Sequence, residues 1–379
     1  MNVSHSSHIS LALLFTAALC ALTQTGCGGT TTIAKATPTP VTPAAQQILF
    51  LPDGVTSTAA FMLNADGSLT AVAGSPFSIG GNGAKADGAG KFLFTEGGTK
   101  LTTNTVSSTG MLAAASSLTD ATLSGAISVN PSGTALYVSS VSAAQSNSGW
   151  KTYSIQANGT LQFVSGQVSQ VDGPLVFTSD GLNAYNATCF HLSANIAHFT
   201  AAANGSLTST GEQVALVPSA NGSECPQTAA VNPAGDTLAS AWREAGAGPA
   251  HNAIALYAIN PSTHALAFTS ASPFPASGVG QDLKYDASGK FIVLAQESGI
   301  GVYNAGTNSV SEITGSPFAS GTNFSRLMFS PSGSFVVAVS QVSQQVSVFA
   351  FNSSTGTLTR APGSPHSVTI AFDLAMIQR

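Results

Sequence analysis

Short runs in which apolar and polar residues alternate fill the chain from residue 46 onward, and each run stops at a turn that contains glycine. Alternation with a period of two residues is typical of β-strands. No long stretch after residue 30 carries the 3.6-residue apolar period of a helix. The pattern therefore predicts an all-β chain.

One of these patterns recurs six times as two strands joined by a tight turn, for example AISVNPSGTALYVSS at 126–140 and RLMFSPSGSFVVAVS at 326–340. Glycine suits such turns because it adopts a positive φ at little cost. The turn glycines stand 43 to 54 residues apart, at Gly90, Gly133, Gly181, Gly235, Gly289 and Gly333. A period of this length, with four short strand patterns in each unit, is typical of a β-propeller.

A second phrase, built on x-Gly-x-Leu or a variant of it, occurs seven times, so six copies of the first phrase leave one unit incomplete. Residues 371–377 resemble the first strand of a seventh unit, and residues 47–51 resemble its second strand. Joining the two ends of the chain removes the unpaired edges that a sheet protein must avoid. We therefore expect a seven-bladed β-propeller with four antiparallel strands per blade, the last blade closed by the N- and C-terminal strands.

The beginning of the chain differs from this repeat. Residues 9–22 form an apolar run of 14 residues, which is too short to span a bilayer, and the run is followed by a bacterial lipoprotein-like pattern ending at Cys27. We expect a signal peptide over 1–27 with lipidation at Cys27, a flexible Thr/Pro/Gly linker over 28–45 and the propeller over 46–379. Ordinary secretion with cleavage nearby is the alternative. Either way the protein is expected to be exported, and lipidation would anchor it to a membrane facing the periplasm or the cell surface.

Charged residues make up only 7% of the chain, and the net charge is −5. Blades that stack face to face bury both sides of each sheet, so they need little charge. A chain without a basic patch is not expected to bind nucleic acid. The sequence has no spacing typical of metal ligands, no phosphate-binding loop and no nucleophile elbow, so we expect neither a metal nor a cofactor. We also expect a monomer.

Two cysteines fall within the repeat region. Cys189 follows a second strand, and Cys225 precedes the first strand of the next unit, so both are expected at one rim of the ring on neighbouring blades. In an oxidising compartment this placement predicts a disulfide, with two free thiols as the alternative.

A charged inner set emerges when residues are counted back from each turn glycine. Residues seven and five positions before the glycine share one face of the innermost strand, and we expect that face to point into the central channel near one rim. Its charged members, the last of them placed by alignment, are Lys85, Asp282, Lys284, Arg326 and Asp373.

Two interpretations of this inner set stay open. The cations could hold a carboxylate or a lactone carbonyl while a carboxylate or His251 activates water. Alternatively, Asp282, Arg326 and Asp373 could form a salt-bridged ring that satisfies its own charges. Strand ends and loops at the same rim add a second candidate set, which consists of Glu96, His191, Arg243, Glu244, His251 and Glu297. Within this set, Arg243 and Glu244 could instead be a solvated ion pair without a function.

The strand and turn motifs resemble a known family. Asn130–Val138 reads NPSGTALYV, Tyr153–Leu161 reads YSIQANGTL, and Gly-Ser-Pro-Phe follows in other units at Gly74–Phe77 and Gly315–Phe318. Together they resemble the lactonase-like seven-bladed propellers, which are related to 6-phosphogluconolactonase and to fungal muconate cycloisomerase. The resemblance covers residues 46–379 and lies in structural motifs, so no catalytic residue is carried over from it.

The resemblance implies a hydrolase of a lactone or a sugar-derived ester, acting outside the cytoplasm if the export signal is correct. The alternative is a propeller of the cell envelope that binds a ligand or a protein without catalysis. A purely structural envelope protein is a third interpretation, because propellers of one fold serve many functions.

Overall fold

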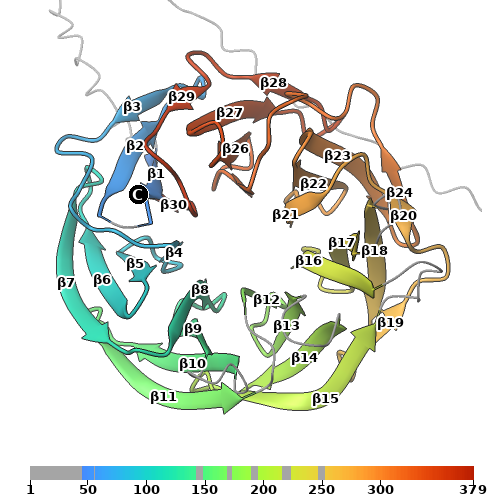
Figure 1. The fold of residues 1–379 in the computed structure, drawn as a ribbon, viewed down its shortest axis with the longest axis horizontal. Helices are drawn as coiled ribbons and strands as arrows, with labels where there is room; N and C mark the ends of the chain where they lie inside the picture. The colour runs from blue at the N-terminus through green and yellow to red at the C-terminus, as the bar shows by residue number, and fades with distance from the viewer. Residues whose placement is uncertain are drawn as a thin grey trace, which may run out of the picture. The chain divides into compact units, whose positions relative to one another are not determined.

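The computed structural model describes residues 45–379 except 55, 142–147, 169–172, 189–194, 216–222 and 246–251. The regular elements of these residues are all β-strands, and they form seven antiparallel sheets arranged as a ring (Figure 1). The all-β, seven-bladed fold predicted from the repeat is confirmed. No helix in these ranges is long and apolar enough to cross a membrane. The predicted signal peptide, with Cys27, and all of the predicted linker except Ala45 lie outside the described residues.

We number the blades along the chain and give the strands of each from the innermost outward. Blade 1 consists of β4 (Gly83–Ala86), β5 (Phe92–Gly97), β6 (Lys100–Val106) and β7 (Leu112–Thr119). Blade 2 consists of β8 (Leu123–Val129), β9 (Ala135–Val141), β10 (Ser148–Ile155) and β11 (Leu161–Val168). Blade 3 consists of β12 (Leu175–Phe177), β13 (Asn183–Thr188), β14 (Asn195–Ala201) and β15 (Leu207–Ala215).

Blades 4 and 6 each carry a short fifth strand beside the third. Blade 4 consists of β16 (Ser223–Val231), β17 (Thr237–Ala245), β18 (Asn252–Ile259), β19 (Leu266–Phe268) and β20 (Phe274–Pro275). Blade 5 consists of β21 (Gly280–Tyr285), β22 (Phe291–Gln296), β23 (Gly299–Gly306) and β24 (Ser309–Glu312). Blade 6 consists of β25 (Arg326–Phe329), β26 (Phe335–Ser340), β27 (Gln345–Phe351), β28 (Leu358–Arg360) and β29 (His366–Ser367).

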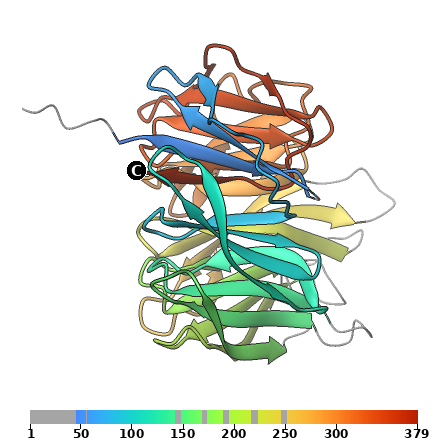
Figure 2. The same ribbon diagram turned by 90° about the vertical axis from the view of Figure 1, so that its left-hand side faces the viewer.

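Blade 7 is built from both ends of the described chain, as predicted. Its strands are β30 (Ala375–Gln378), β1 (Gln47–Pro52), β2 (Thr58–Leu63) and β3 (Leu69–Ala71). The innermost pair joins the two ends, with Ile48 opposite Ile377. The backbones of Gln46 and Arg379 exchange two hydrogen bonds of 2.8 Å beyond the last ladder pair. Figure 2, turned by 90°, shows the blue β1 beside the dark red C-terminal strand.

The hydrophobic core is divided into seven layers, one between each pair of neighbouring blades. Strand β1 shows how the alternating sequence produces this arrangement. Ile48 and Phe50 pack against blade 1, whereas Leu49 and Leu51 pack against blade 6. Full burial of one such side chain contributes roughly 1.5–3 kcal/mol. A strand of this kind therefore stabilises two interfaces of the ring at once.

The predicted turns form as the sequence requires. All six turn glycines have φ between 67° and 76°, the left-handed region that glycine tolerates. Side chains at the start of the turn hold the hairpin closed. Asp286 Oδ1, for example, accepts a hydrogen bond of 2.7 Å from the backbone N–H of Phe291.

The Ser-Pro dipeptides that follow the fourth strand have a structural role in blades 4 to 7. The peptide bond between the serine and the proline is cis in each dipeptide. Each serine hydroxyl accepts a hydrogen bond of 2.8 or 2.9 Å from a backbone N–H of the third strand. The serines are Ser75, Ser272, Ser316 and Ser364. Blades 1 to 3 instead have longer fourth strands, each with a register shift against the third strand. The ring is therefore uneven at its outer edge.

Candidate functional site

The charged inner set lies on one side of the ring. Its residues belong to β21, β25 and β4 and to the segment just before β30, which are innermost parts of the four consecutive blades 5, 6, 7 and 1 (Figure 1). We call Lys85, Asp282, Lys284, Arg326 and Asp373 the charged arc. The corresponding inner positions of blades 2 to 4 carry Ala126, Ser128, Pro174, Val176, Thr228 and Ala230, which are neutral.

Two ion pairs neutralise both aspartates of the charged arc. Lys85 Nζ lies 2.7 Å from Asp373 Oδ2, and Lys284 Nζ lies 2.5 Å from Asp282 Oδ1. The lysine side chains are more than a third exposed, so each pair contributes little stability on its own. The pairing differs from the salt-bridged ring of Asp282, Arg326 and Asp373 considered above, because lysines rather than the arginine neutralise the acids.

The two aspartates also clamp neighbouring blades together. Asp282 Oδ2 accepts a hydrogen bond of 3.0 Å from the N–H of Leu327 in blade 6. Asp373 Oδ2 accepts one of 3.1 Å from the N–H of Ala84 in blade 1. Each aspartate also accepts a bond from the N–H of the residue that follows it. The repeated geometry gives both carboxylates a structural role, and it shows that Asp373 occupies the position assigned to it by alignment.

Arg326 is the cation of the charged arc that pairs with no acid. Its Nη1 donates a hydrogen bond of 2.8 Å to the carbonyl of Ser325, and no described carboxylate lies within salt-bridge distance. Its charge nevertheless acts on Asp373. Burial raises the pKa of Asp373, but the charges of Lys85 and Arg326 and the hydrogen bonds from Lys85 and Ala84 outweigh it, so this pKa lies below its usual value.

The charged arc therefore carries three cations and two anions. With both aspartates ionised and paired, the remaining charge is that of Arg326. A partly exposed guanidinium beside paired charges is suited to a carboxylate, or to an oxygen that gains negative charge during a reaction.

The predicted rim set is only partly described. His191 and His251 lie outside the described residues, and for Glu244 only the strand position is described. Arg243 and Glu297 are exposed. Glu297 Oε1 accepts a hydrogen bond of 3.2 Å from the side-chain amide of Gln281. Cys225 is buried, but Cys189 lies outside the described residues, so the disulfide stays a prediction.

Glu96, a member of the candidate rim set, is buried rather than open to solvent. It lies near the end of β5 and is 0% exposed, and neither carboxyl oxygen has a hydrogen-bond partner among the described residues. Gly125 of blade 2 lies beside it, since a β-carbon on Gly125 would be 3.5 Å from Glu96 Oε2, an ordinary van der Waals distance. Burial raises the pKa of Glu96 to about 7.

The repeat shows how unusual this glutamate is. It stands six residues after its turn glycine, and the same position in blades 2 to 6 carries small or apolar residues: Ser139, Ala187, Ala241, Ala295 and Val339. This comparison was available in the sequence and was the signal that Glu96 would be buried.

A buried histidine in blade 3 is held between two side chains. His198 Nδ1 lies 2.9 Å from Glu212 Oε2, and its Nε2 lies 3.0 Å from Asn183 Oδ1. Glu212 Oε1 also accepts a hydrogen bond of 2.7 Å from the N–H of Leu266 in blade 4. Burial lowers the pKa of His198, although Glu212 opposes this shift. The network joins blades 3 and 4 and lies outside the charged arc.

Within the part of the chain that the structure describes, no three His, Cys, Asp or Glu side chains come together as a metal site would require.

Residues 299–371 match the family model described as Lactonase, 7-bladed beta-propeller. The chain has no significant match among curated proteins. Several solved structures have a similar fold over nearly their whole length. A Bacteroides fragilis protein provisionally named a 6-phosphogluconolactonase is 13% identical, with a TM-score of 0.69 over 89% of this chain and 100% of the other. The periplasmic gluconolactonase of Pseudomonas aeruginosa is 16% identical, with a TM-score of 0.66 over 88% and 99% of the two chains.

Proposed function

We propose that this protein, a lactonase-like seven-bladed β-propeller, hydrolyses a lactone or a sugar-derived ester at the charged arc. The observation that carries the proposal is the guanidinium of Arg326, which pairs with no described carboxylate, whereas the other charges of the arc are matched. The family match within residues 299–371, which include β27 of blade 6 and β23 of blade 5, supports the same class of reaction.

In the proposed reaction, water attacks the lactone carbonyl carbon and the ring C–O ester bond breaks. The products are a carboxylate and an alcohol: one proton of the water passes to the leaving alkoxide, and the other is released to the solvent as the new carboxylic acid ionises. Arg326 would hold the carbonyl oxygen as it gains negative charge, which is the step at which fixed cations contribute most. Lys85 and Lys284 would keep the aspartates paired, so that these carboxylates do not repel the developing anion.

Asp373 is a poor general base because its pKa lies below the usual value and its oxygens are already occupied. The group that activates water therefore belongs elsewhere at this rim. His251, which lies outside the described residues, is the sequence candidate for it.

We further propose that the reaction takes place outside the cytoplasm, on a protein anchored through Cys27. This rests on the export pattern in residues 1–27. The periplasmic location named for the Pseudomonas aeruginosa gluconolactonase is compatible with it.

Replacement of Arg326 tests the catalytic role. We expect Arg326→Gln to lower kcat/KM for glucono-1,5-lactone by about 100-fold, the usual scale for loss of one oxyanion donor. The matched control is Arg360→Gln, because Arg360 lies on the outer strand β28, 5.6 Å from the centre of the Phe349 ring. Proton release above the spontaneous rate measures the reaction. Equal activity in the wild type and Arg326→Gln would remove Arg326 from the mechanism.

Ligand binding without catalysis is the second candidate function. The structural role of both aspartates favours it, because these carboxylates are held by blade-to-blade hydrogen bonds. A wild-type protein that binds aldonolactones or aldonates but never exceeds the spontaneous hydrolysis rate would establish this alternative.

A further inference from the structure

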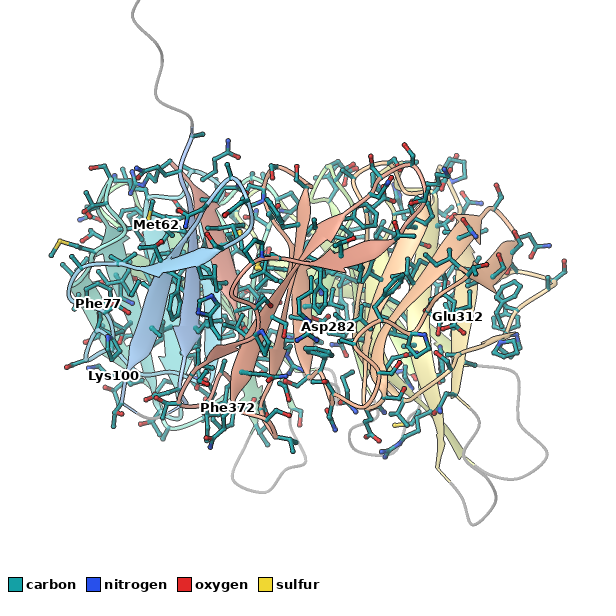
Figure 3. All side chains as sticks on the ribbon, turned by 90° about the horizontal axis from the view of Figure 1, so that it is seen from above. Met62, Phe77, Lys100, Asp282, Glu312 and Phe372 are labelled. Carbon is teal, nitrogen blue, oxygen red and sulfur yellow. The ribbon has the colours of Figure 1, made fainter. Side chains whose placement is uncertain are left out.

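A hollow of about 280 Å³ lies between blades 7 and 1, among residues that differ from the charged arc. The residues that matter for its chemistry are Ser78, Gly80, Gly97, Lys100, Thr102 and Ala114. They come from the segment that leads into blade 1 and from three of its strands. We call this hollow the blade 7–1 pocket. Figure 3 labels Lys100 and Phe77, which precedes the lining segment, on the same part of the ring.

The corresponding place between blades 4 and 5 is filled by a polar network. Ser277 Oγ donates a hydrogen bond of 2.8 Å to Glu312 Oε1 and lies 3.2 Å from the hydroxyl of Tyr303. Gln296 Nε2 donates one of 3.0 Å to the same hydroxyl. Tyr303 and Gln296 are fully buried. The four side chains thus form a plug that contains one carboxylate, one amide and two hydroxyls.

Strand register identifies the counterparts of these residues in blade 1. Gln296 pairs with Gly299 as Gly97 pairs with Lys100, and Tyr303 pairs with Glu312 as Asn104 pairs with Ala114. Ser277 and Gly80 each stand three residues after the phenylalanine of a Ser-Pro-Phe sequence. The counterparts of the plug are therefore Gly97, Asn104, Ala114 and Gly80.

Three of these four counterparts have no polar side chain, and the fourth does not enter the pocket. Asn104 Nδ2 instead donates to the carbonyl of Leu93 at 3.1 Å. The pocket exists because the side chains that fill its counterpart are missing. Glycine and alanine also leave backbone groups open to a ligand.

The charge of the pocket is opposite to that of the plug. Lys100 occupies the position of Gly299, and Ala114 replaces the acidic Glu312. The Lys100 ammonium makes no hydrogen bond or ion pair with a described residue, and the hydroxyls of Ser78 and Thr102 likewise have no such partner. Thr102 lines the pocket although it is only 8% exposed, so this part of the lining is largely shielded from the open surface.

We propose that the blade 7–1 pocket binds a small polyhydroxylated carboxylate, which supplies the carboxylate and hydroxyl groups that the protein itself supplies between blades 4 and 5. Lys100 pairs with the ligand carboxylate, and Ser78 and Thr102 bind its hydroxyls. The volume is just below the 300 Å³ at which pockets for drug-sized ligands begin, which suits a molecule of sugar-acid size. This binding site is separate from the charged arc and does not depend on catalysis there.

Titration calorimetry with D-gluconate tests the proposal, carried out on the full chain in an Arg326→Gln background so that the charged arc does not contribute. We expect one gluconate per chain and at least a tenfold weaker affinity after Lys100→Gln. Ala114→Glu places a carboxylate where Glu312 stands in blade 5 and should abolish binding without lowering the Tm, because Ala114 is exposed.

Lys91→Gln is the matched control, because Lys91 is an exposed lysine of the same blade whose ammonium bonds to the carbonyl of Ala157. It should leave the affinity unchanged. D-glucose tests the need for the carboxylate, and acetate tests the need for the hydroxyls. Absence of gluconate binding, binding unchanged by both Lys100→Gln and Ala114→Glu, or acetate binding as tight as that of gluconate would each overturn the proposal.

Discussion

Glu96 shows how a single buried residue can make the stability of the ring depend on pH. Its carboxyl group is buried without a hydrogen-bond partner in the described part of the chain, and burial raises its pKa to about 7. The folded protein therefore favours the neutral acid, whereas the unfolded chain ionises near the ordinary value of 4.5. The contribution of Glu96 therefore leaves the free energy of unfolding at its full value below pH 4.5 and lowers it as the pH rises from 4.5 to about 7.

We predict that Glu96→Gln removes this loss. The wild type should lose about 3 kcal/mol of unfolding free energy between pH 4.5 and pH 8 relative to the variant, because one pKa unit corresponds to about 1.4 kcal/mol. Urea unfolding at several pH values measures the difference. Glu297→Gln, at an exposed carboxylate, is the control and should follow the wild type. Parallel pH profiles for the wild type and Glu96→Gln would show that this carboxyl group is stabilised by a contact other than those described.

The sequence also predicts which inner residues are charged, but not how they pair. Counting from the turn glycines places Asp282 and Asp373 at equivalent positions, and their matching contacts with Leu327 and Ala84 confirm the count. The choice of lysine over Arg326 as the partner depends on how far each flexible side chain reaches. A repeat period does not contain that information.

At the scale of the element, the Ser-Pro segments explain how a blade ends when its fourth strand is short. Strand β28 has three residues, and beyond it the hydroxyl of Ser364 accepts a hydrogen bond of 2.9 Å from the N–H of Val348 in β27. The serine thus replaces a partner that a longer strand would provide. The Ser-Pro segments therefore substitute for strand pairing at the ends of blades 4 to 7.

We predict that Ser364→Ala destabilises the protein by about 1–3 kcal/mol, because the N–H of the fully buried Val348 loses its acceptor. Ser262→Ala, at an exposed turn, is the control and should change stability by less than about 0.5 kcal/mol. Thermal unfolding of both variants gives the comparison. A loss of similar size in the two variants would mean that the Ser364 hydroxyl adds nothing specific.

Strand pairing within blades could be predicted, whereas the blade 7–1 pocket could not. Alternating residues such as Leu49 and Phe50 fix which neighbour each side chain faces. The pocket arises from side chains that are missing at Gly80, Gly97 and Ala114. An alternating sequence pattern gives no sign of it, and its origin becomes clear only when these positions are compared with the filled counterpart between blades 4 and 5.

At the scale of the whole molecule, the ring is chemically uneven. Four consecutive blades supply the charged arc, and three supply neutral residues at the same inner positions. The closure of the ring lies within the charged arc, because Asp373 just before β30 meets Lys85 of β4. The joining of the two chain ends in blade 7 therefore completes the charged arc as well as the fold.

The central claim is that this charged arc receives a lactone or its carboxylate product. The most direct measurement is a crystal structure of the protein soaked with an aldonolactone. We predict ligand density on the inner side of blades 5 to 7 and 1, with a ligand oxygen within hydrogen-bond distance of the Arg326 guanidinium. The account would be contradicted if Arg326 formed an ion pair with Asp282 or Asp373 and the ligand bound only at a distance from these blades.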